Sequence, residues 1–187
     1  MNELEQKLEV VDENDNVIGL ESRSKIHKDG LLHREIHVFF ITPNGEIIFQ
    51  HRAKNKDTYP DKLDATVGGH VEPGMSYEET AIKECEEETG VNINLDDLLF
   101  LKKLKRESFD ETTGKRNNTI RSQYAYLYKT SIQDLQIEKG KSEGFEAWKI
   151  NEPSNISESD RERFIQVFLS EDMIKLYKKA YLYFMSK

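Results

Sequence analysis

Three glutamates in the middle of the chain have the spacing of a metal site. Glu87 and Glu88 follow Glu84 by three and four residues, so on a helix the three carboxylates share one patch of surface. Like charges at this spacing repel one another, and they become favourable when a divalent cation lies among them. Mg²⁺ and Mn²⁺ prefer oxygen ligands, and magnesium sites commonly combine a few carboxylates with waters and substrate phosphates. The alternative is a solvated acidic face, which is what most glutamate-rich runs are.

The residues around the three glutamates favour the metal site. A glycine-rich stretch from Gly68 to Gly74 precedes them, and Ser76 followed three residues later by Glu79 is a capping-box signature. A helix is therefore expected to begin near Ser76, and Gly90 is typical of its end. One face of this helix is apolar: Ala81, Ile82 and Cys85. The pattern predicts a glycine loop that leads onto a helix N-terminus, where backbone N–H groups can bind phosphate.

From Gly69 to Val91 the chain resembles the Nudix box, G-x5-E-x7-R-E-U-x-E-E-x-G-U, in which U is apolar. The three glutamates match the metal-binding positions of the box. Met75 stands where the box has Glu, and Lys83 where it has Arg; in the family these two side chains commonly pair. Because both have changed, the loss is easier to tolerate than the loss of one. Lys83 can still screen the acidic patch, since Glu87 lies four residues later, but it cannot make the planar two-pronged contact of Arg, and its box partner at 75 is absent. We therefore expect a working but less rigid loop and weaker metal binding than a full box gives.

The N-terminal half resembles the isopentenyl-diphosphate isomerase branch of the superfamily, a resemblance that a set of Nudix hydrolases shares. It rests on residues 10–19, 30–34, 50–52 and 59–60. The isomerase needs a cysteine within the stretch that here spans 64–70, and none is present. The only thiol, Cys85, lies on the apolar side of the box helix. The resemblance also implies a metal held by several histidines and by two glutamates on a later strand.

His27, His33 and His70 could supply those histidines, but the later strand aligns at 120–123, where Arg121 and Gln123 stand instead of carboxylates. The isomerase reaction moves a proton across a double bond, and this chain lacks both the cysteine and the pair of glutamates that this step needs. Ordinary hydrogen bonding is the preferred interpretation for His27, His33 and His37. His70 borders the phosphate loop and remains a candidate for substrate binding.

Composition limits the class of protein. The 187 residues are 36% hydrophobic and 33% charged, with a net charge of -8, which is typical of a globular domain with a polar surface. A nucleic-acid binder would usually carry a basic patch, so a polymer of nucleotides is not expected as a partner. There is no apolar run of membrane length and no signal-peptide core, and the single cysteine excludes an internal disulfide framework. These features predict a cytoplasmic protein with no membrane contact.

Strand and turn patterns predict a mixed sheet. Strands are expected at 8–11, 17–20, 36–42, 46–51, 63–67, 119–129 and 145–150, with turn-like or polar loops at 25–30, 52–61, 109–118 and 139–144. From Ser157 onward the pattern is helical. The aromatic stripe there either packs on the sheet, which is preferred, or forms a homodimer surface. The expected class is α/β (α+β): the Nudix fold, an α/β/α sandwich with a mixed β-sheet plus C-terminal helices. A single domain is expected over 1–187, with its core at 8–170 and a helical extension at 157–187.

The Nudix resemblance implies metal-dependent hydrolysis of a diphosphate bond in a nucleoside di- or triphosphate, or in a small molecule that links a nucleoside diphosphate to another group. Glu84, Glu87 and Glu88 are the expected Mg²⁺ or Mn²⁺ ligands and catalytic residues. The candidate general base is Glu143, in the segment 141–145, with a box glutamate as the alternative. Two other functions stay open, a nucleotide-binding module without turnover and the isomerase. The candidate substrate-binding residues are Arg52, Lys62, Gly68, Gly69 and His70.

Overall fold

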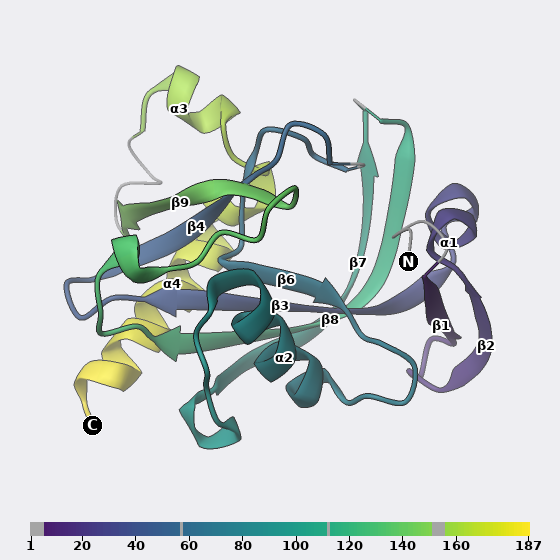
Figure 1. Cartoon of the computed structure of the whole chain (residues 1–187), viewed down its shortest axis with the longest axis horizontal. Coiled ribbons are helices and arrows are strands. Elements are labelled where there is room, and N and C mark those ends of the chain that lie inside the picture. Colours follow the sequence, from purple (N-terminus) through teal and green to yellow (C-terminus); the bar gives the residue numbers. More distant parts are fainter. Residues whose placement is uncertain (1–5, 57, 112, 151–155) are drawn as a thin grey trace.

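One mixed sheet of nine strands organises the molecule (Figure 1). The computed structural model describes residues 6–56, 58–111, 113–150 and 156–187. The strands are β1 (Lys7–Val11), β2 (Val17–Ser22), β3 (Leu32–Ile41), β4 (Glu46–Arg52), β5 (Leu63–Asp64), β6 (Val67–His70), β7 (Leu99–Asp110), β8 (Lys115–Leu127) and β9 (Ser142–Lys149). The α-helices are α1 (Arg23–Asp29), α2 (Tyr77–Thr89), α3 (Glu158–Glu162) and α4 (Glu171–Met185), and the short 3₁₀ helices are η2 (Leu95–Asp97), η3 (Ile132–Asp134) and η5 (Gln166–Leu169).

Strand β3 is the centre of the sheet. It pairs in antiparallel fashion with β1, β4 and β6, and in parallel with β8 along its whole length. Its second half, from Ile36 to Ile41, is buried on both faces. Continuous burial explains why the sequence there is a run of apolar residues rather than a strict alternation. The single polar exception, His37, lines the cavity described below.

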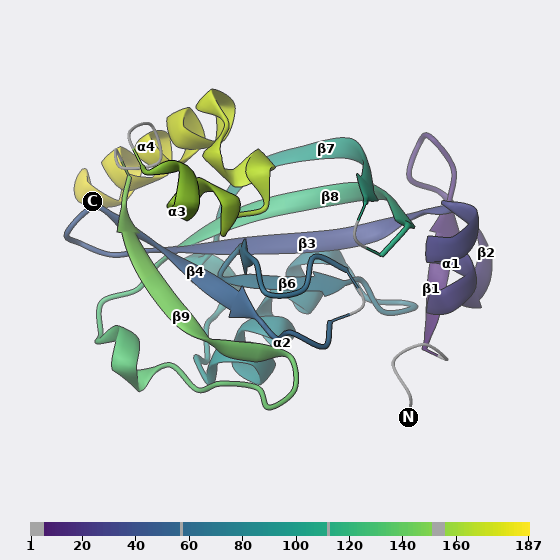
Figure 2. The ribbon, with the colours of Figure 1, turned by 90° about the horizontal axis from the view of Figure 1, so that it is seen from above.

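Helices cover both faces of the sheet (Figure 2). Alternate side chains of β3 point to opposite faces: Ile36, Val38 and Phe40 pack toward α2, whereas Phe39 and Ile41 pack toward α4. The resulting α/β/α sandwich is the predicted fold. The C-terminal aromatic residues join the second of these clusters: Phe164, Phe168 and Tyr177 are buried, and Tyr181 and Phe184 pack against them partly buried. The stripe therefore packs on the sheet, as preferred.

Several element boundaries differ from the sequence-based expectation. Residues 23–29 form the helix α1 instead of a turn, because the Ser22 hydroxyl accepts the Lys25 N–H and Gly30 ends the helix at φ 67°. Strands β7 and β8 pair as a long antiparallel hairpin, so most of the expected loop at 109–118 is strand. Strand β9 begins at Ser142, earlier than expected. None of the helices in the described ranges is long and apolar enough to cross a membrane.

Candidate functional site

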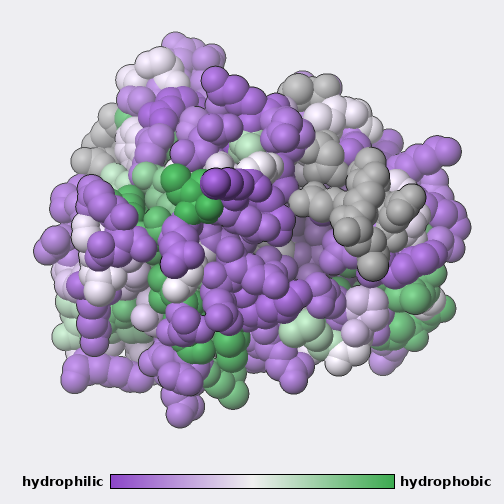
Figure 3. Space-filling view, in the orientation of Figure 1, coloured by the Kyte–Doolittle hydropathy of each residue, from purple (hydrophilic) through white to green (hydrophobic). Residues whose placement is uncertain are grey.

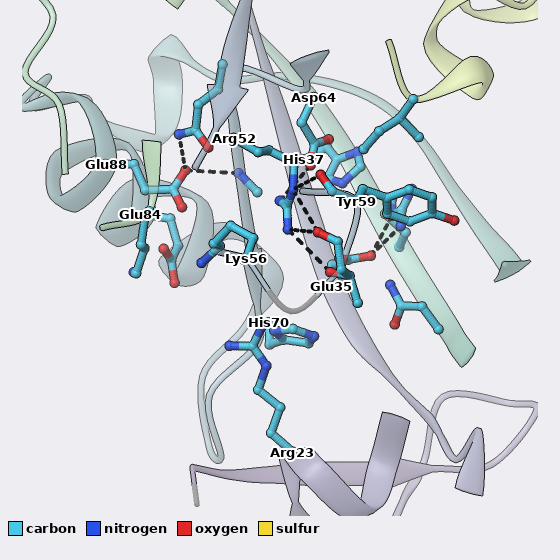
Figure 4. Close-up of a pocket in the computed structure, with 18 of the residues that line it drawn as sticks. Arg23, Glu35, His37, Arg52, Lys56, Tyr59, Asp64, His70, Glu84 and Glu88 are labelled. Atoms are coloured by element: carbon cyan, nitrogen blue, oxygen red, sulfur yellow. Dashed lines mark hydrogen bonds and ion pairs between the residues drawn. The ribbon is translucent and has the colours of Figure 1, made fainter. Parts of the chain in front are cut away.

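A polar cavity of about 530 Å³ opens beside α2 (Figure 4). Its walls come from the central strands β3, β4 and β6, from the β7–β8 hairpin, from α1 and α2, and from η5. The surface around it is mainly hydrophilic (Figure 3). A cavity of this size has room for a nucleotide-sized ligand.

The box glutamates reach this cavity from α2. The helix begins with the predicted capping box, in which the Ser76 hydroxyl accepts the Glu79 N–H and the Glu79 carboxylate accepts the Ser76 N–H. Glu84 and Glu88 are buried, at 8% and 5% exposure. Glu87 lies at the rim with 48% of its side chain exposed. All three line the cavity, so the structure brings the predicted trio together.

Glu88 is held in place from two strands. Its Oε2 accepts hydrogen bonds from Gln50 Nε2 on β4 and from the backbone N–H of Gly68 on β6, both at 3.2 Å (Figure 4). Glu84 accepts no hydrogen bond among the described residues. Burial raises the pKa of Glu84 to about 7 and that of Glu88 to about 8; the Glu87 charge adds to the first shift and the Glu84 charge to the second, while Lys141 opposes both. Two buried carboxylates that share so little compensating charge are suited to a divalent cation.

The raised pKa values give the metal-free protein a pH-dependent stability. Between pH 6.5 and 8 the unfolded chain has ionised both glutamates, whereas the folded chain still binds protons at Glu84 and Glu88. The free energy of unfolding should therefore fall as pH rises through 7 and 8, by up to about 1.4 kcal/mol per pH unit for each retained proton. Mg²⁺ should flatten this dependence because it replaces the protons. Urea unfolding at pH 6.5 and 8.0, with EDTA or with Mg²⁺, measures it.

The variant Glu88→Gln is the matched control for this pH effect, because it removes one of the two titrating groups. It should show a shallower decline than the wild type in EDTA. An EDTA-treated wild type that is equally stable at both pH values would contradict the prediction.

Strand β6 passes very close to Glu84 at Gly69. A Cβ atom built on Gly69 would lie 2.5 Å from Cδ and 2.7 Å from Oε1 of the Glu84 carboxylate. The glycine is therefore required by this close approach and not by an unusual backbone angle. It allows the sheet to press against α2 where the carboxylate enters the cavity.

Lys83 lies beside the acidic patch, as expected, and it also has a partner that the box pattern does not indicate. Lys83 Nζ lies 2.6 Å from Glu72 Oε1, in the loop before α2, and 3.7 Å from Glu87 Oε2. Met75 packs, partly buried, against the apolar cluster under α2. The bond between loop and helix is thus kept, with the carboxylate moved three residues toward the N-terminus.

This rearrangement changes what box-restoring substitutions should do. Met75→Glu alone should leave Mg²⁺ affinity nearly unchanged, because Lys83 is already engaged by Glu72. Glu72→Gln should weaken Mg²⁺ about two- to threefold, since a half-exposed ion pair contributes little. Adding Met75→Glu to Glu72→Gln should recover that loss. Mg²⁺ titrations of the four proteins test this, with Glu86→Gln as the control for an exposed charge on the same helix; equal affinities throughout would contradict it.

The guanidinium donors of Arg52 are occupied by protein groups and are not free to bind phosphate in the predicted two-pronged way. Its guanidinium donates to Asp64 Oδ2 at 2.9 Å and to the carbonyl oxygens of Thr58 and Tyr59 at 2.7 to 3.2 Å. These contacts use its donors to fix the loop that follows β4. Arg52 lines the cavity, but its hydrogen bonds hold that loop in place.

Two further candidates lie outside the cavity. Lys62 Nζ donates to the carbonyl of Glu162 at 2.6 Å, so it ties the loop to the C-terminal segment. Glu143 is exposed on β9, because this strand begins at Ser142 and not after Gly144. Neither is among the residues that line the cavity. Gly68 and Gly69 do line it, although the Gly68 N–H is directed at Glu88.

Three histidines from different elements meet at one end of the cavity: His27 of α1, His33 of β3 and His70 of β6. Their ring centroids are 5.1 to 5.3 Å apart, and one ring nitrogen from each lies within 4.8 Å of the others. His33 Nδ1 donates to the Leu31 carbonyl at 2.9 Å, which leaves its Nε2 as an acceptor. The buried Nε2 atoms of His33 and His70 have no hydrogen-bond partner among the described residues. Ordinary hydrogen bonding therefore accounts for only part of this cluster.

Burial lowers the pKa of His33 to about 4 and that of His70 well below its usual range, so both rings are neutral at pH 7. Neutral imidazoles with converging nitrogens can hold a transition-metal ion. The glutamate pair that the isomerase resemblance implies is absent at 121 and 123. Arg121 instead donates from Nε to Glu35 at 2.8 Å, on the neighbouring strand. Although burial alone would raise it, this guanidinium holds the pKa of Glu35 well below its usual range.

The sequence did not reveal several residues of the cavity. The pairing of β7, β8 and β3 brings Arg106, Arg121 and Glu35 to it, and the loops before β5 and β9 bring Tyr59 and Lys141. An alternating strand pattern carries no information about which strands become neighbours. The one sequence feature that could have pointed to Arg106, Arg121 and Glu35 is that they are charged residues within strands that are otherwise half-buried.

Comparison with known proteins identifies the family of the chain. A model of the Nudix domain matches residues 31–168. An uncharacterised Nudix hydrolase of Yersinia pestis is 42% identical over 84 residues, which cover 45% of this chain and 46% of the relative. Another, from Clostridium acetobutylicum, is 28% identical over 152 residues, covering 79% and 72%. The chain spans about half the length of the first relatives it matches.

Solved structures show the same fold at low identity. The crystal structure of DR0079 from Deinococcus radiodurans has a TM-score of 0.66 at 22% identity and covers 94% of this chain and 99% of its own. The Nudix domain of Shewanella oneidensis NrtR, complexed with ADP-ribose, has a TM-score of 0.54 at 13% identity and covers 86% and 97%. Because the domain model spans most of the chain, and the box glutamates meet in a cavity of this fold, the chain belongs to the Nudix family.

Proposed function

We propose that the chain is a metal-dependent hydrolase that cleaves a diphosphate bond in a nucleoside di- or triphosphate, or in another compound that links a nucleoside diphosphate to a second group. The observation that carries this proposal is the pair of buried carboxylates, Glu84 and Glu88, which face a polar cavity of nucleotide size. Membership of the Nudix family and the names of the curated relatives support it.

Glu84, Glu87 and Glu88 would hold Mg²⁺ or Mn²⁺, the ions that carboxylate oxygens suit. When bound, the metal would neutralise charge on the diphosphate oxygens and lower the pKa of a water molecule. Gln50 and the Gly68 N–H orient Glu88 for this role, at 3.2 Å each. Gly69 leaves the space that the Glu84 carboxylate occupies.

We place the general base within the box, the alternative that the sequence left open. Glu143 is exposed on β9, away from the cavity lining. Glu84 is the better candidate, because its carboxylate lines the cavity and accepts no hydrogen bond among the described residues, so an oxygen is free to take a proton from water.

The ligand is proposed to be a small molecule and not a nucleic-acid polymer. The cavity of about 530 Å³ suits a nucleotide, and the net charge of -8 opposes binding to a polyanion. The neighbouring Nudix domain with bound ADP-ribose supports a diphosphate that joins two groups. ADP-ribose is therefore a suitable first compound for an activity screen.

The test is a screen of nucleoside di- and triphosphates and diphosphate-linked nucleotides with Mg²⁺ and with Mn²⁺, with products separated by chromatography. At least one compound should be cleaved at its diphosphate, only with metal. Binding of nucleotides with no cleavage under any condition would favour the binding-module alternative instead. The Lys83–Glu72 bond removes the main ground for that alternative, because the two box departures leave the loop tied to the helix.

The isomerase alternative finds little support. Cys85, the only thiol of the chain, is fully buried in the apolar cluster beneath α2, and burial raises its pKa well above its usual range. A thiol in that place packs as a small apolar side chain. Cys85→Ala should therefore leave the chemistry unchanged.

A further inference from the structure

The far side of the cavity holds an arginine that no carboxylate contacts among the described residues. Arg106 of β7 lines the cavity, and no hydrogen bond or ion pair engages its half-buried guanidinium within the described ranges. Two other arginines that line the cavity have carboxylate partners: Arg52 binds Asp64, and Arg121 binds Glu35. A charge that is partly removed from water and left unpaired is costly, so its presence calls for an external partner.

Arg121 adds a second guanidinium beside it. In the register of β7 and β8, Arg106 lies opposite Thr119, and Arg121 follows two residues later, on the same face of the sheet. Burial lowers the pKa of Arg106, and the nearby charge of Arg121 lowers it further. Glu35 compensates one of the two charges through its contact with Arg121. One positive charge therefore remains uncompensated between these three side chains.

Another polar side chain on this wall is open to a ligand. Asn117 has a buried Oδ1 atom without a partner among the described residues, and this amide oxygen can accept a hydrogen bond from a ligand hydroxyl. Tyr59 is fixed above this wall in a left-handed conformation, φ 46°, by its N–H donating to Asp110 Oδ2 at 2.8 Å. Such strain in a non-glycine residue persists only where the surroundings enforce it.

This wall lies across the cavity from the box carboxylates. In Figure 4, Glu84 and Glu88 are on one side, Glu35 and Tyr59 are on the other, and Lys56 and His37 lie between them. A diphosphate held at the box would leave the rest of the ligand to extend toward Arg106. Guanidinium groups bind phosphate and carboxylate oxygens through two parallel hydrogen bonds.

We propose that Arg106, backed by Arg121, forms a second anion subsite that selects diphosphate compounds carrying a further oxyanion, a phosphate monoester or a carboxylate, at the end remote from the box. This proposal deepens the proposed function and rests on it for the orientation of the ligand. It defines the substrate by charge: the preferred compound has one anionic group more than its diphosphate.

Three dinucleotides with the same diphosphate test the subsite. Relative to NAD⁺, NADP⁺ adds a phosphate monoester, and nicotinic acid adenine dinucleotide replaces an amide by a carboxylate. Their dissociation constants should be measured by calorimetry in EDTA, where metal-dependent turnover cannot interfere. The wild type should bind NADP⁺ or the nicotinic acid dinucleotide at least about tenfold more tightly than NAD⁺, and whichever is preferred identifies the oxyanion.

Arg106→Gln should reduce that preference to less than about threefold while leaving the affinity for NAD⁺ unchanged. Arg106→Lys should retain part of the preference because the positive charge remains, but not all of it, because lysine cannot make two parallel hydrogen bonds. The matched control is Lys105→Gln, which removes the same charge from the neighbouring residue, on the opposite side of the strand and paired with Glu13; it should retain the full preference.

Several results would overturn the subsite: no preference over NAD⁺ in the wild type, no binding of any of the three compounds, or an equal loss for all three in Arg106→Gln. Turnover with Mg²⁺ is measured separately. Cleavage without a charge preference would refute the subsite and leave the hydrolase standing. A charge preference in EDTA, with no cleavage of any compound in the nucleotide screen, would refute the hydrolase and leave the subsite standing.

Discussion

Replacing Glu88 by glutamine is expected to lower metal-dependent turnover by at least about a hundredfold with the fold intact. The substitution keeps the shape of a side chain that is 5% exposed, but it removes a negative ligand from the cavity. The metal is expected to supply most of the charge stabilisation of the transition state, so weakening its site should act mainly on kcat. Steady-state rates at saturating Mg²⁺, together with calorimetric Mg²⁺ affinity, measure the effect.

The matched control is Glu86→Gln, which removes one carboxylate from the exposed side of the same helix. It should leave both turnover and Mg²⁺ affinity within about twofold of the wild type. Near-full activity in Glu88→Gln would show that the metal is bound elsewhere, and attention would then move to the histidine cluster. Metal-free Glu88→Gln should also be more stable than the wild type at pH 8, because a buried charge has been removed.

Replacing Gly69 by alanine is expected to cost nearly as much activity as removing the Glu84 carboxylate itself, on the order of a hundredfold. The new Cβ would lie 2.5 Å from Cδ of Glu84, a separation that non-bonded atoms do not tolerate. The atom in conflict is at the end of a flexible side chain, so the backbone can stay in place while the carboxylate rotates away. Turnover and Mg²⁺ affinity should therefore fall with little loss of thermal stability.

Gly19→Ala is the control, because its Cβ would meet nothing closer than Val10 Cβ at 4.0 Å. It should preserve activity. The double variant Gly69→Ala/Glu84→Gln should be hardly worse than either single variant, since both act through one carboxylate. Additive losses would mean that Gly69 serves another purpose, such as direct contact with the ligand.

The box helix was predictable because all of its signals are local. Ser76, Glu79 and Gly90 set its ends, and the three glutamates share one face by spacing alone. No long-range information is needed for these inferences, which is why the core of the site was identified from the sequence. The sandwich of a mixed sheet between helices was likewise expected from the strand and helix patterns together.

The rest of the site depends on strand pairing, and the sequence does not encode that pairing locally. Glu35 and Arg121 are 86 residues apart and meet only because β3 and β8 are parallel neighbours. Lys83 forms an ion pair with Glu72, whereas the family pattern has the partner carboxylate at position 75, where this chain has Met75. Arg52 ends a strand as expected, but the carbonyl groups of a loop use its donors, a competition that residue type alone does not reveal.

The parallel pairing of β3 with β8 also has a consequence for synthesis of the chain. Paired residues of the two strands are 86 positions apart. At about 5–20 residues per second, a ribosome needs roughly 4 to 17 seconds to make the segment between them. During that time β3 is an apolar strand with one open edge, which is a template for aggregation. The central strand is thus deeply buried in the finished sheet but lacks a partner on one edge for seconds during synthesis, so we expect chaperone binding there during translation.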